Sequence, residues 1–318
     1  MRLRVLRKCL NGILSFGLNI GNIHRDKSLE LNMIDSTERI RKYYENKWNK
    51  YFHGSNETQK EFVLDKGDWI SNSNGVFGVG EGFSFKGEIQ CSDNNRKYTI
   101  NLNGNSIGHR RSDVSYNSRI INVLDSSKCE IKNGILKSKN VLDKGAAICV
   151  GINGVLYCNM CVFEDNHTGC SGGAIYSCEY SNIKLNKCKF RNNSASGFGG
   201  AIFVGSNAIF ESIDSEFIKN KSRCAQGGAI YFKDNSKSLC FKDCMFINNK
   251  SKYYGESIFI NGKNDLECFN CEFVHDSYDE RHDELVYAHD FANVKLYDCN
   301  ITDNKLLQKK HAYNYLKS

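Results

Sequence analysis

The 318-residue chain contains no proline, no block of lysine and arginine, and no apolar run of membrane-spanning length. The missing proline, with abundant Asn, Lys, Ser, Ile and Tyr, indicates an AT-rich coding sequence more than a structural constraint. The net charge is +7, but the two signs are interspersed, which excludes the basic track of a protein that follows a nucleic-acid backbone. We therefore expect no nucleic-acid partner and no membrane span.

The first 30 residues share some features with a secretory signal. Four basic residues lie within the first eight positions, but Asn11 and Asn19 interrupt the apolar stretch that follows. No small-x-small cleavage pattern follows clearly. The 15 cysteines would remain thiols in a reducing compartment and would pair in an oxidising one. The sequence by itself therefore leaves the compartment and the cysteine redox state open.

Two short motifs recur in phase through the chain. The copies of the first, GGAI, begin at Gly145, Gly172, Gly199, Gly227 and Gly255, and a degenerate copy begins at Asp283. The copies of the second, C-x-F, begin at Cys161, Cys188, Ser215, Cys244, Cys271 and Cys299. Successive GGAI copies are 27 or 28 residues apart. Two motifs in phase over six units indicate a repeat architecture.

Each repeat unit contains short runs of alternating polarity separated by Asn, Ser and Gly, and no helical period fills it. This pattern predicts an all-β fold, a right-handed parallel β-helix (solenoid) of about eight coils over residues 61–304. A stretch with helical periodicity at 35–52 predicts a short helical N-terminal cap within residues 31–60. Residues 305–318 form a C-terminal tail that we expect to cover the other end.

The period of two predicts which side chains fill the solenoid. The first and third residues of C-x-F are apolar in nearly every coil, so they point inward, as does the isoleucine of GGAI. The glycine before the alanine of GGAI is expected to face inward and to let the wall turn. The Asn that follows C-x-F, such as Asn193, is expected to stack at a corner, where it tolerates left-handed geometry and bonds its neighbours in the stack.

The pairing of GGAI with F-x-x-N resembles the repeat of the chlamydial polymorphic membrane proteins. It reads FEDN at 163–166, GGAI at 172–175, FRNN at 190–193, GGAI at 199–202, FIKN at 217–220, GGAI at 227–230 and FINN at 246–249. Similar repeats occur in pectate-lyase-like right-handed β-helix proteins, some of which are enzymes on polysaccharides. The resemblance implies a surface or adhesin-like role and favours an extracellular or particle-surface location.

An aromatic residue follows the GGAI isoleucine and, by the alternation, points outward. This column consists of Tyr176, Phe203, Tyr231, Phe259 and Tyr287. Five stacked rings on a flat wall would suit sugar faces or an apolar protein partner. The alternative is structural, with a column that stabilises itself or is covered by the N-terminal helix or a loop.

Two acidic residues, Asp214 and Asp243, hold equivalent outward positions on adjacent coils. Two carboxylates at such a short separation could share a proton, bind a cation or act as an acid/base pair on a glycan. Lys187 and Lys189 lie one coil away and could neutralise them. The alternative is therefore a solvated face of alternating charge.

Metal ligation has two candidates. C158-N-M-C161 and C268-F-N-C271 look like halves of a zinc site, but they lie four coils apart, too far for one ion. His275, His282 and His289 lie in an acidic stretch, 275–290, where GGAI has decayed, and they could bind a metal. Decay towards the end of a solenoid is the alternative explanation. We expect no cofactor.

The regular wall favours a non-catalytic surface or structural module that binds a glycan or protein partner through its lateral face. The alternative is a polysaccharide lyase or glycoside hydrolase that uses carboxylates on the coil face. An enzyme should break the repeat around a cleft and place an Arg or Lys beside its carboxylates, and the repeat places no Arg beside Asp214 and Asp243. The oligomeric state is not indicated by the sequence.

Overall fold

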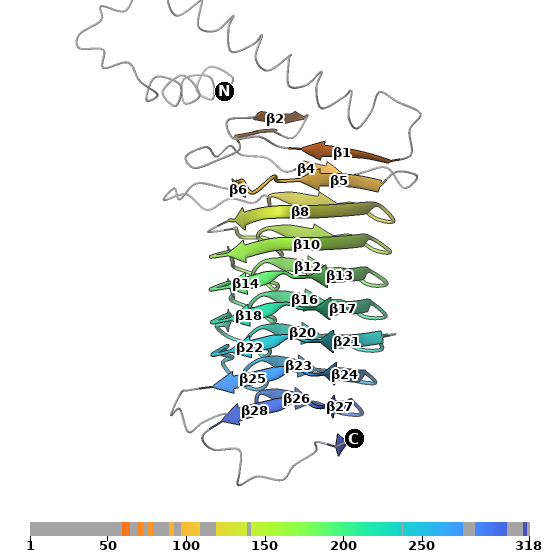
Figure 1. Cartoon of the computed structure of the whole chain (residues 1–318), viewed down its shortest axis with the longest axis vertical. Coiled ribbons are helices and arrows are strands. Elements are labelled where there is room, and N and C mark those ends of the chain that lie inside the picture. The colour runs from red at the N-terminus through yellow and green to blue at the C-terminus, as the bar shows by residue number, and fades with distance from the viewer. Residues whose placement is uncertain are drawn as a thin grey trace, which may run out of the picture.

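The computed structural model describes residues 59–63, 69–72, 75–78, 89–91, 97–108, 119–138, 141–236, 238–275, 284–303 and 314–316. Within these ranges the chain forms strands and no helix, and its coils stack along one axis as a parallel β-solenoid (Figure 1). The exception to parallel pairing there is the hairpin of β2 (Trp69–Asn72) and β3 (Gly75–Gly78). As the chain descends in Figure 1, it runs leftward in the nearer layer and rightward in the paler one, which is a right-handed winding. The predicted all-β solenoid is confirmed.

One wall of the solenoid is an 8-stranded parallel sheet that contains the GGAI isoleucines. Its strands are β4 (Ile89–Cys91), β7 (Ile121–Val123), β9 (Ile148–Val150), β12 (Ile175–Ser177), β16 (Ile202–Val204), β20 (Ile230–Phe232), β23 (Ile258–Ile260) and β26 (Val286–Ala288). Ile175 pairs with Ile202, and Ile202 with Ile230, so the register reproduces the sequence intervals. Eight stacked strands enclose about seven full turns, close to the predicted number of coils.

The opposite wall is a 16-stranded sheet with two limbs that meet at a bend. The first limb contains β1 (Gln59–Val63), β5 (Lys97–Asn101), β13 (Asn182–Asn186), β17 (Ile209–Ile213), β21 (Ser238–Lys242), β24 (Asp265–Phe269), β27 (Asn293–Tyr297) and β29 (Asn314–Leu316). The second contains β6 (Ser106–Gly108), β14 (Lys189–Arg191), β18 (Glu216–Ile218), β22 (Met245–Ile247), β25 (Glu272–His275) and β28 (Asn300–Asp303). The long strands β8 (Lys128–Lys137) and β10 (Val155–Glu164) run through both limbs.

A small third sheet lies between the two walls in the chain order. It contains β11 (His167–Thr168), β15 (Ser194–Ala195) and β19 (Lys221–Ser222). The coils upstream of the first GGAI copy stack in the same register, because Ile121 pairs with Ile148 and Lys132 pairs with Asn159. Each described coil is therefore a closed circuit of short strands joined by turns.

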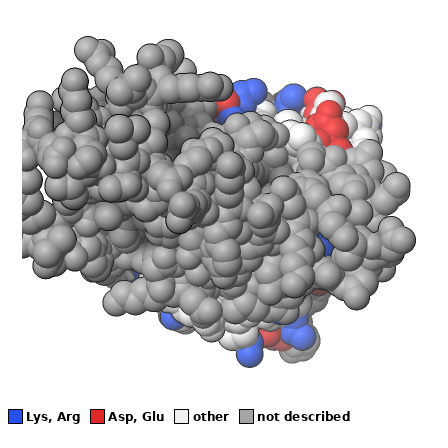
Figure 2. Space-filling view, turned by 90° about the horizontal axis from the view of Figure 1, so that it is seen from above, with Lys and Arg blue, Asp and Glu red and all other residues white. Residues whose placement is uncertain are grey.

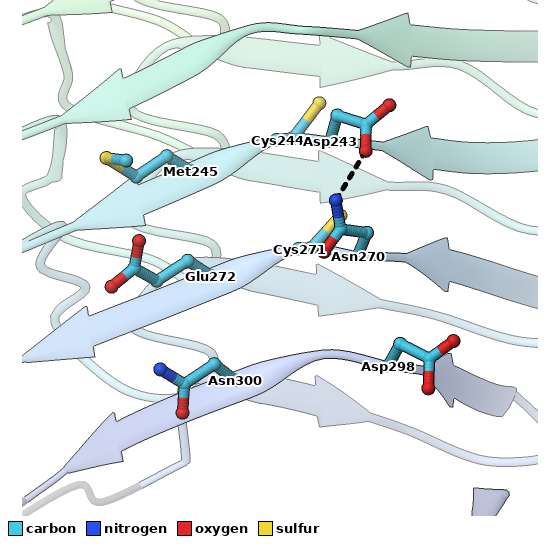
Figure 3. Close-up of a pocket in the computed structure, with 8 residues that line it drawn as sticks. All are labelled: Asp243, Cys244, Met245, Asn270, Cys271, Glu272, Asp298 and Asn300. Atoms are coloured by element: carbon cyan, nitrogen blue, oxygen red, sulfur yellow. Dashed lines mark hydrogen bonds between the residues drawn. The ribbon is translucent and has the colours of Figure 1, made fainter. Parts of the chain in front are cut away.

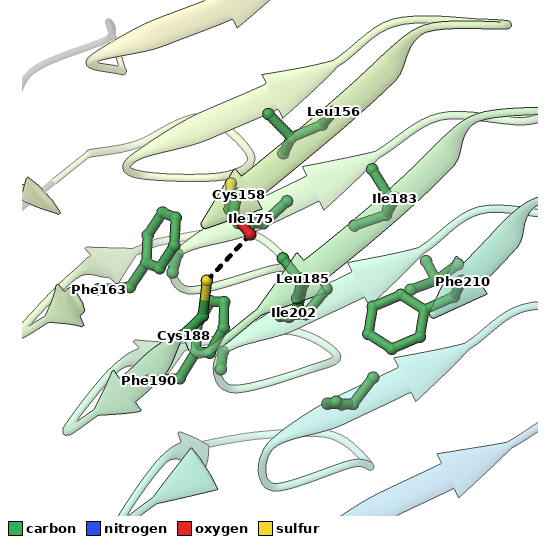
Figure 4. Close-up of a cluster of buried hydrophobic side chains, with 14 of the residues drawn as sticks. Leu156, Cys158, Phe163, Ile175, Ile183, Leu185, Cys188, Phe190, Ile202 and Phe210 are labelled. Carbon is green, nitrogen blue, oxygen red and sulfur yellow. Dashed lines mark hydrogen bonds between the residues drawn. The ribbon is translucent and has the colours of Figure 1, made fainter. Parts of the chain in front are cut away.

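The C-x-F motif fills the interior as predicted. The phenylalanines at its third position are fully buried and stack face to face through five coils, with ring centroids 4.6 to 5.0 Å apart. The rings are those of Phe163, Phe190, Phe217, Phe246 and Phe273. Figure 4 shows Phe163 and Phe190 beside the inward cysteines and the aliphatic side chains of the facing wall. Burial of these rings supplies much of the hydrophobic stabilisation of each coil.

A buried asparagine ladder lies at the corner after the C-x-F motif, as predicted. The Nδ2 of Asn193 donates to Oδ1 of Asn220 at 2.9 Å and to the backbone oxygen of Phe163 at 3.0 Å. The expected left-handed backbone, however, belongs to the residue before the ladder, such as Asn192 (φ 53°) or Lys219 (φ 53°). The ladder asparagines are therefore selected for their buried amide hydrogen bonds rather than for their backbone conformation.

The two glycines of GGAI are required at their positions for different physical reasons. Gly199 adopts φ 66°, where glycine is favoured. At Gly200 a Cβ atom would lie 2.1 Å from the backbone oxygen of Gly228 on the next coil and 2.5 Å from the backbone carbon of Lys221. The second glycine was expected to face inward and to let the wall turn. Instead it lets the backbones of successive coils approach each other.

The expected helical cap at 31–60 lies outside the described residues, apart from Gln59 and Lys60, which begin β1. In the tail, β29 pairs with β27 and extends the first limb of the large sheet. In the part of the chain that the structure describes, no helix has the length and apolar character needed to cross a membrane.

Candidate functional site

The predicted aromatic column lies on the outside of the GGAI wall, separate from the interior core. The strand register places Tyr176, Phe203, Tyr231, Phe259 and Tyr287 one above the other. Neighbouring rings are 4.7 to 5.4 Å apart and lie nearly parallel. Because each ring faces the next ring, the column presents ring edges rather than ring faces to its surroundings.

The middle of this column does not face water, contrary to the sequence-based expectation. Phe203, Tyr231 and Phe259 are only 8, 8 and 4 % exposed. The ring of Phe198 lies 4.6 Å from that of Tyr231, and the ring of Tyr254 lies 4.7 Å from that of Tyr287. Both covering rings come from the turns that precede GGAI. The column is therefore partly covered by loops, as in the alternative interpretation in which the column has a structural role.

Three exposed aromatic residues lie in the turns that precede GGAI on two of the coils. We name Phe198, Tyr253 and Tyr254 the outer ring layer, and their side chains are 37, 45 and 41 % exposed. These residues are not evident from the repeat because the position varies from coil to coil. The available signal was an aromatic residue one or two positions before the first GGAI glycine, in F198-G-G and Y253-Y254-G.

The two predicted carboxylates, Asp214 and Asp243, occupy the bend between the limbs of the large sheet. Both adopt φ 53°, and other coils place Lys187, Asn270 and Asp298 in this left-handed conformation at the same position. Asp and Asn are enriched in that conformation. Their recurrence on adjacent coils therefore has a backbone explanation that requires no catalysis.

Asp243, but not Asp214, lines a surface groove on this wall (Figure 3). The groove has a volume of about 340 Å³ and is lined by Asp243, Cys244, Met245, Asn270, Cys271, Glu272, Asp298 and Asn300. The Nδ2 of Asn270 donates to Oδ1 of Asp243 at 2.7 Å. The lining contains three carboxylates and no lysine or arginine. Asp214 and Asp243 are thus not brought together in one cleft.

The charged side chains of the large sheet form ion pairs between coils. Glu216 forms ion pairs with Lys189 at 2.7 Å and with Arg191 at 3.2 Å. Lys184 forms an ion pair with Glu211 at 2.9 Å. Burial of Glu216 opposes its ionisation, but these two cations hold its pKa below the usual value. At the rim visible in Figure 2, blue and red side chains lie side by side rather than in blocks. The wall is a surface of alternating charge, as the structural alternative predicted.

The cysteines of the C-x-F motif are not joined by disulfides, and all of them are buried except Cys299, which is half-buried. Cys188 donates its thiol to the backbone oxygen of Cys158 at 3.4 Å, and Cys244 donates to that of Ser212 at 3.3 Å. Burial raises the pKa of Cys188. Among the described residues, no group of three or more His, Cys, Asp or Glu side chains has a metal-binding arrangement.

The three histidine candidates are not brought together by the described structure. His275 ends β25 on the large sheet, whereas His289 follows β26 on the GGAI wall. His289 Nδ1 lies 3.1 Å from Oδ1 of Asn261 and 3.2 Å from the carboxylate of Asp290. His282 lies outside the described residues.

The stacked coils and their two recurring motifs define a parallel β-solenoid repeat protein. Residues 160–178 and 187–205 match the Chlamydia polymorphic membrane protein (Chlamydia_PMP) repeat. Each matched segment runs from the bend residue, through the C-x-F motif and the asparagine ladder, into GGAI. Over these residues the chain resembles the repeat of the polymorphic membrane proteins. No curated protein and no solved structure matches the chain.

Proposed function

We propose that the chain is a non-catalytic, adhesin-like surface module that binds a protein partner through its lateral face. The outer ring layer carries this proposal. Phe198, Tyr253 and Tyr254 are 37 to 45 % exposed, and each belongs to a turn that borders the regular GGAI wall. Aromatic residues, Tyr above all, are enriched in protein interfaces because they offer large contact area with little conformational entropy. The repeat resemblance supports a surface role.

A protein partner suits this surface better than a glycan. A sugar ring packs its C–H groups against the face of an aromatic ring, where the negative charge of the ring lies. In the column the faces are already used, since Phe203 stacks on Tyr176 with an angle of 4° between the planes. The ring of Tyr254 likewise stacks on Tyr287. Edges and tilted rings suit the mixed apolar surface of a protein.

The enzyme alternative has less support from the geometry. Its two carboxylates, Asp214 and Asp243, sit at a bend that selects Asp and Asn, and only Asp243 lines the groove. Polysaccharide lyases and hydrolases need convergent acid and base groups around the scissile bond. The groove lining contains no cation beside its carboxylates.

Binding of fluorescently labelled protein to intact cells tests the proposal. The triple variant F198S/Y253S/Y254S should bind at least about tenfold more weakly, since truncated aromatic hot spots cost about 2 kcal/mol or more. The matched control is F291S, which removes a 79 % exposed ring from the turn after β26, outside the outer ring layer. Protease treatment of the cells should abolish binding. Binding that survives protease and is lost on glycan removal would instead assign a glycan partner.

A further inference from the structure

Basic side chains gather on the small third sheet, which lies between the two walls in the chain order. Thr168, Ala195 and Ser222 point inward from its strands, since all three are fully buried. The strand alternation therefore points their chain neighbours outward. On the coil of β19 these neighbours are Lys221 and Arg223, and both are exposed. The outward side chains of this coil are thus cationic.

The next coil repeats this pattern. Lys250 pairs in register with Lys221, and Lys252, two residues further on, is exposed. Lys219, at the corner before β19, is exposed as well. The basic strip, as we name this set, consists of Lys219, Lys221, Arg223, Lys250 and Lys252. Strands lie about 4.8 Å apart and side chains on one face of a strand recur about every 7 Å, so the fold brings together five cations that the sequence separates.

The exposed cations of the basic strip form no ion pair with any carboxylate that the structure describes. The cations of the large sheet, by contrast, are paired, as Lys189 is with Glu216. The carboxylate on the turn after Lys250 is that of Glu256. It is 5 % exposed and accepts the backbone N–H of Ser251 at 3.0 Å, so it does not face solvent. Among the described side chains, the strip therefore presents a net positive charge.

The charge of the basic strip reaches His167 on the neighbouring strands. Arg223 donates from Nη2 to Oγ of Ser194 at 3.4 Å, and Nδ1 of His167 lies 3.0 Å from the same oxygen. Burial, followed by the charge of Arg223, lowers the pKa of His167. A positive neighbour has this effect because it opposes protonation of the imidazole. The charge of the strip thus acts on the side chains beside it.

The basic strip borders the outer ring layer at two points. Lys252 directly precedes Tyr253. The hydroxyl of Ser222, which lies between two cations of the strip, donates to the backbone oxygen of Gly197 at 2.8 Å. This bond joins β19 to the turn that contains Phe198. Cationic and aromatic side chains are thus adjoining parts of one surface.

We propose that the protein partner of this surface is acidic, with a segment rich in Asp and Glu that also carries apolar or aromatic side chains. The inference rests on the proposed function and names the chemistry of its partner. Carboxylates of the partner meet the cations of the basic strip, and its apolar groups pack on the outer ring layer. A partner without acidic groups would bury part of the strip unpaired, at a cost in desolvation.

Other polyanions fit the combined surface less well. A single-stranded nucleic acid needs aromatic side chains among the cations, on which its bases stack, and the basic strip consists of Lys and Arg alone. A sulfated polysaccharide could pair with the cations. It would gain little from Tyr254, however, because that ring already stacks on Tyr287.

The test measures binding of a fluorescent random copolymer of Glu and Tyr to the full-length protein by anisotropy. The strip variant K219Q/K221Q/R223Q/K252Q should bind the copolymer at least about tenfold more weakly, because four exposed charge pairs are lost. The matched control K128Q/K187Q/K242Q/K263Q removes four exposed charges from other parts of the surface, so its affinity should fall less than about threefold. Both variants should unfold at the same denaturant concentration as the unmodified protein, since every substituted side chain is exposed.

A second probe, poly-glutamate, separates the two parts of the surface. It should bind more weakly than the copolymer, and F198S/Y253S/Y254S should remove that difference alone. Equal affinity of the strip variant and the matched control for the copolymer overturns the acidic partner, and it leaves the cell-binding test of the proposed function intact. Binding to intact cells that is lost on heparinase treatment and survives protease also overturns it, because the occupant is then a sulfated polysaccharide.

Discussion

The side-chain amide of Asn193 donates to the side-chain oxygen of Asn220 at 2.9 Å, and both side chains are fully buried. Each ladder amide satisfies groups on the coils above and below it, so its removal leaves buried donors and acceptors unpaired. We expect N193A to lower the free energy of unfolding by about 2 kcal/mol in chemical denaturation.

The matched control for the ladder is N186A. Asn186 also donates to an asparagine of the neighbouring coil, Asn159, at 2.8 Å, but this pair is exposed to solvent. Water can replace that bond, so N186A should cost less than about 0.5 kcal/mol. Equal losses for the two variants would show that burial of the ladder contributes nothing.

Close packing between coils at Gly200 gives a second prediction. A Cβ at this position would meet backbone atoms at 2.1 and 2.5 Å, and backbone atoms cannot move aside as a side chain can. G200A should therefore lower the unfolding free energy by about 3 kcal/mol or more. At Gly169 the nearest atom would be 3.5 Å away, so G169A should be tolerated. A stable G200A variant would contradict the proposed reason for the second glycine.

Tyr231 links the aromatic column to stability at high pH. Burial, followed by the charge of Asp234, raises the pKa of Tyr231 to about 12. An unfolded tyrosine ionises near pH 10. The contribution of Tyr231 to stability is thus complete below about pH 10 and is lost as pH rises through about 12. Y231F should lose less stability than the unmodified protein between these values in denaturation at a series of pH values, whereas Y180F, at an exposed site, should behave like the unmodified protein.

The ion pairs of Glu216 give the opposite pH dependence. Its pKa is lowered in the folded protein, so its contribution is present above the unfolded value and is lost as pH falls through the folded one. E216Q should cost at most about 1 kcal/mol at pH 7, because the side chains of Lys189 and Arg191 are 41 and 43 % exposed and solvent screens the pairs. The difference from the unmodified protein should vanish near pH 3. A difference that persists in acid would assign the effect to packing rather than charge.

Much of the fold follows from the sequence because the solenoid repeats one local solution. The interval between Gly172 and Gly199 sets the register directly, and the alternation around Phe190 separates interior from exterior. The cover over Tyr231 could not be predicted in this way. It depends on how the turn containing Phe198 folds back across a coil boundary, and turn residues are not constrained by the period of two.

The candidate carboxylates illustrate a second limit. The sequence places Asp214 and Asp243 at equivalent positions, but it does not reveal that the position has a left-handed backbone. Proximity in a column is therefore no evidence of catalysis by itself, because Asp and Asn are enriched in this conformation.

The most direct test of the proposed function is site-specific photo-crosslinking from the outer ring layer. A benzophenone side chain in place of Tyr253 should yield one adduct of defined mass with a cell-surface protein. The same probe in place of Phe291, which is 79 % exposed, should yield none. Equal adducts at both positions, or no adduct at position 253 under conditions where the protein binds cells, would contradict the account.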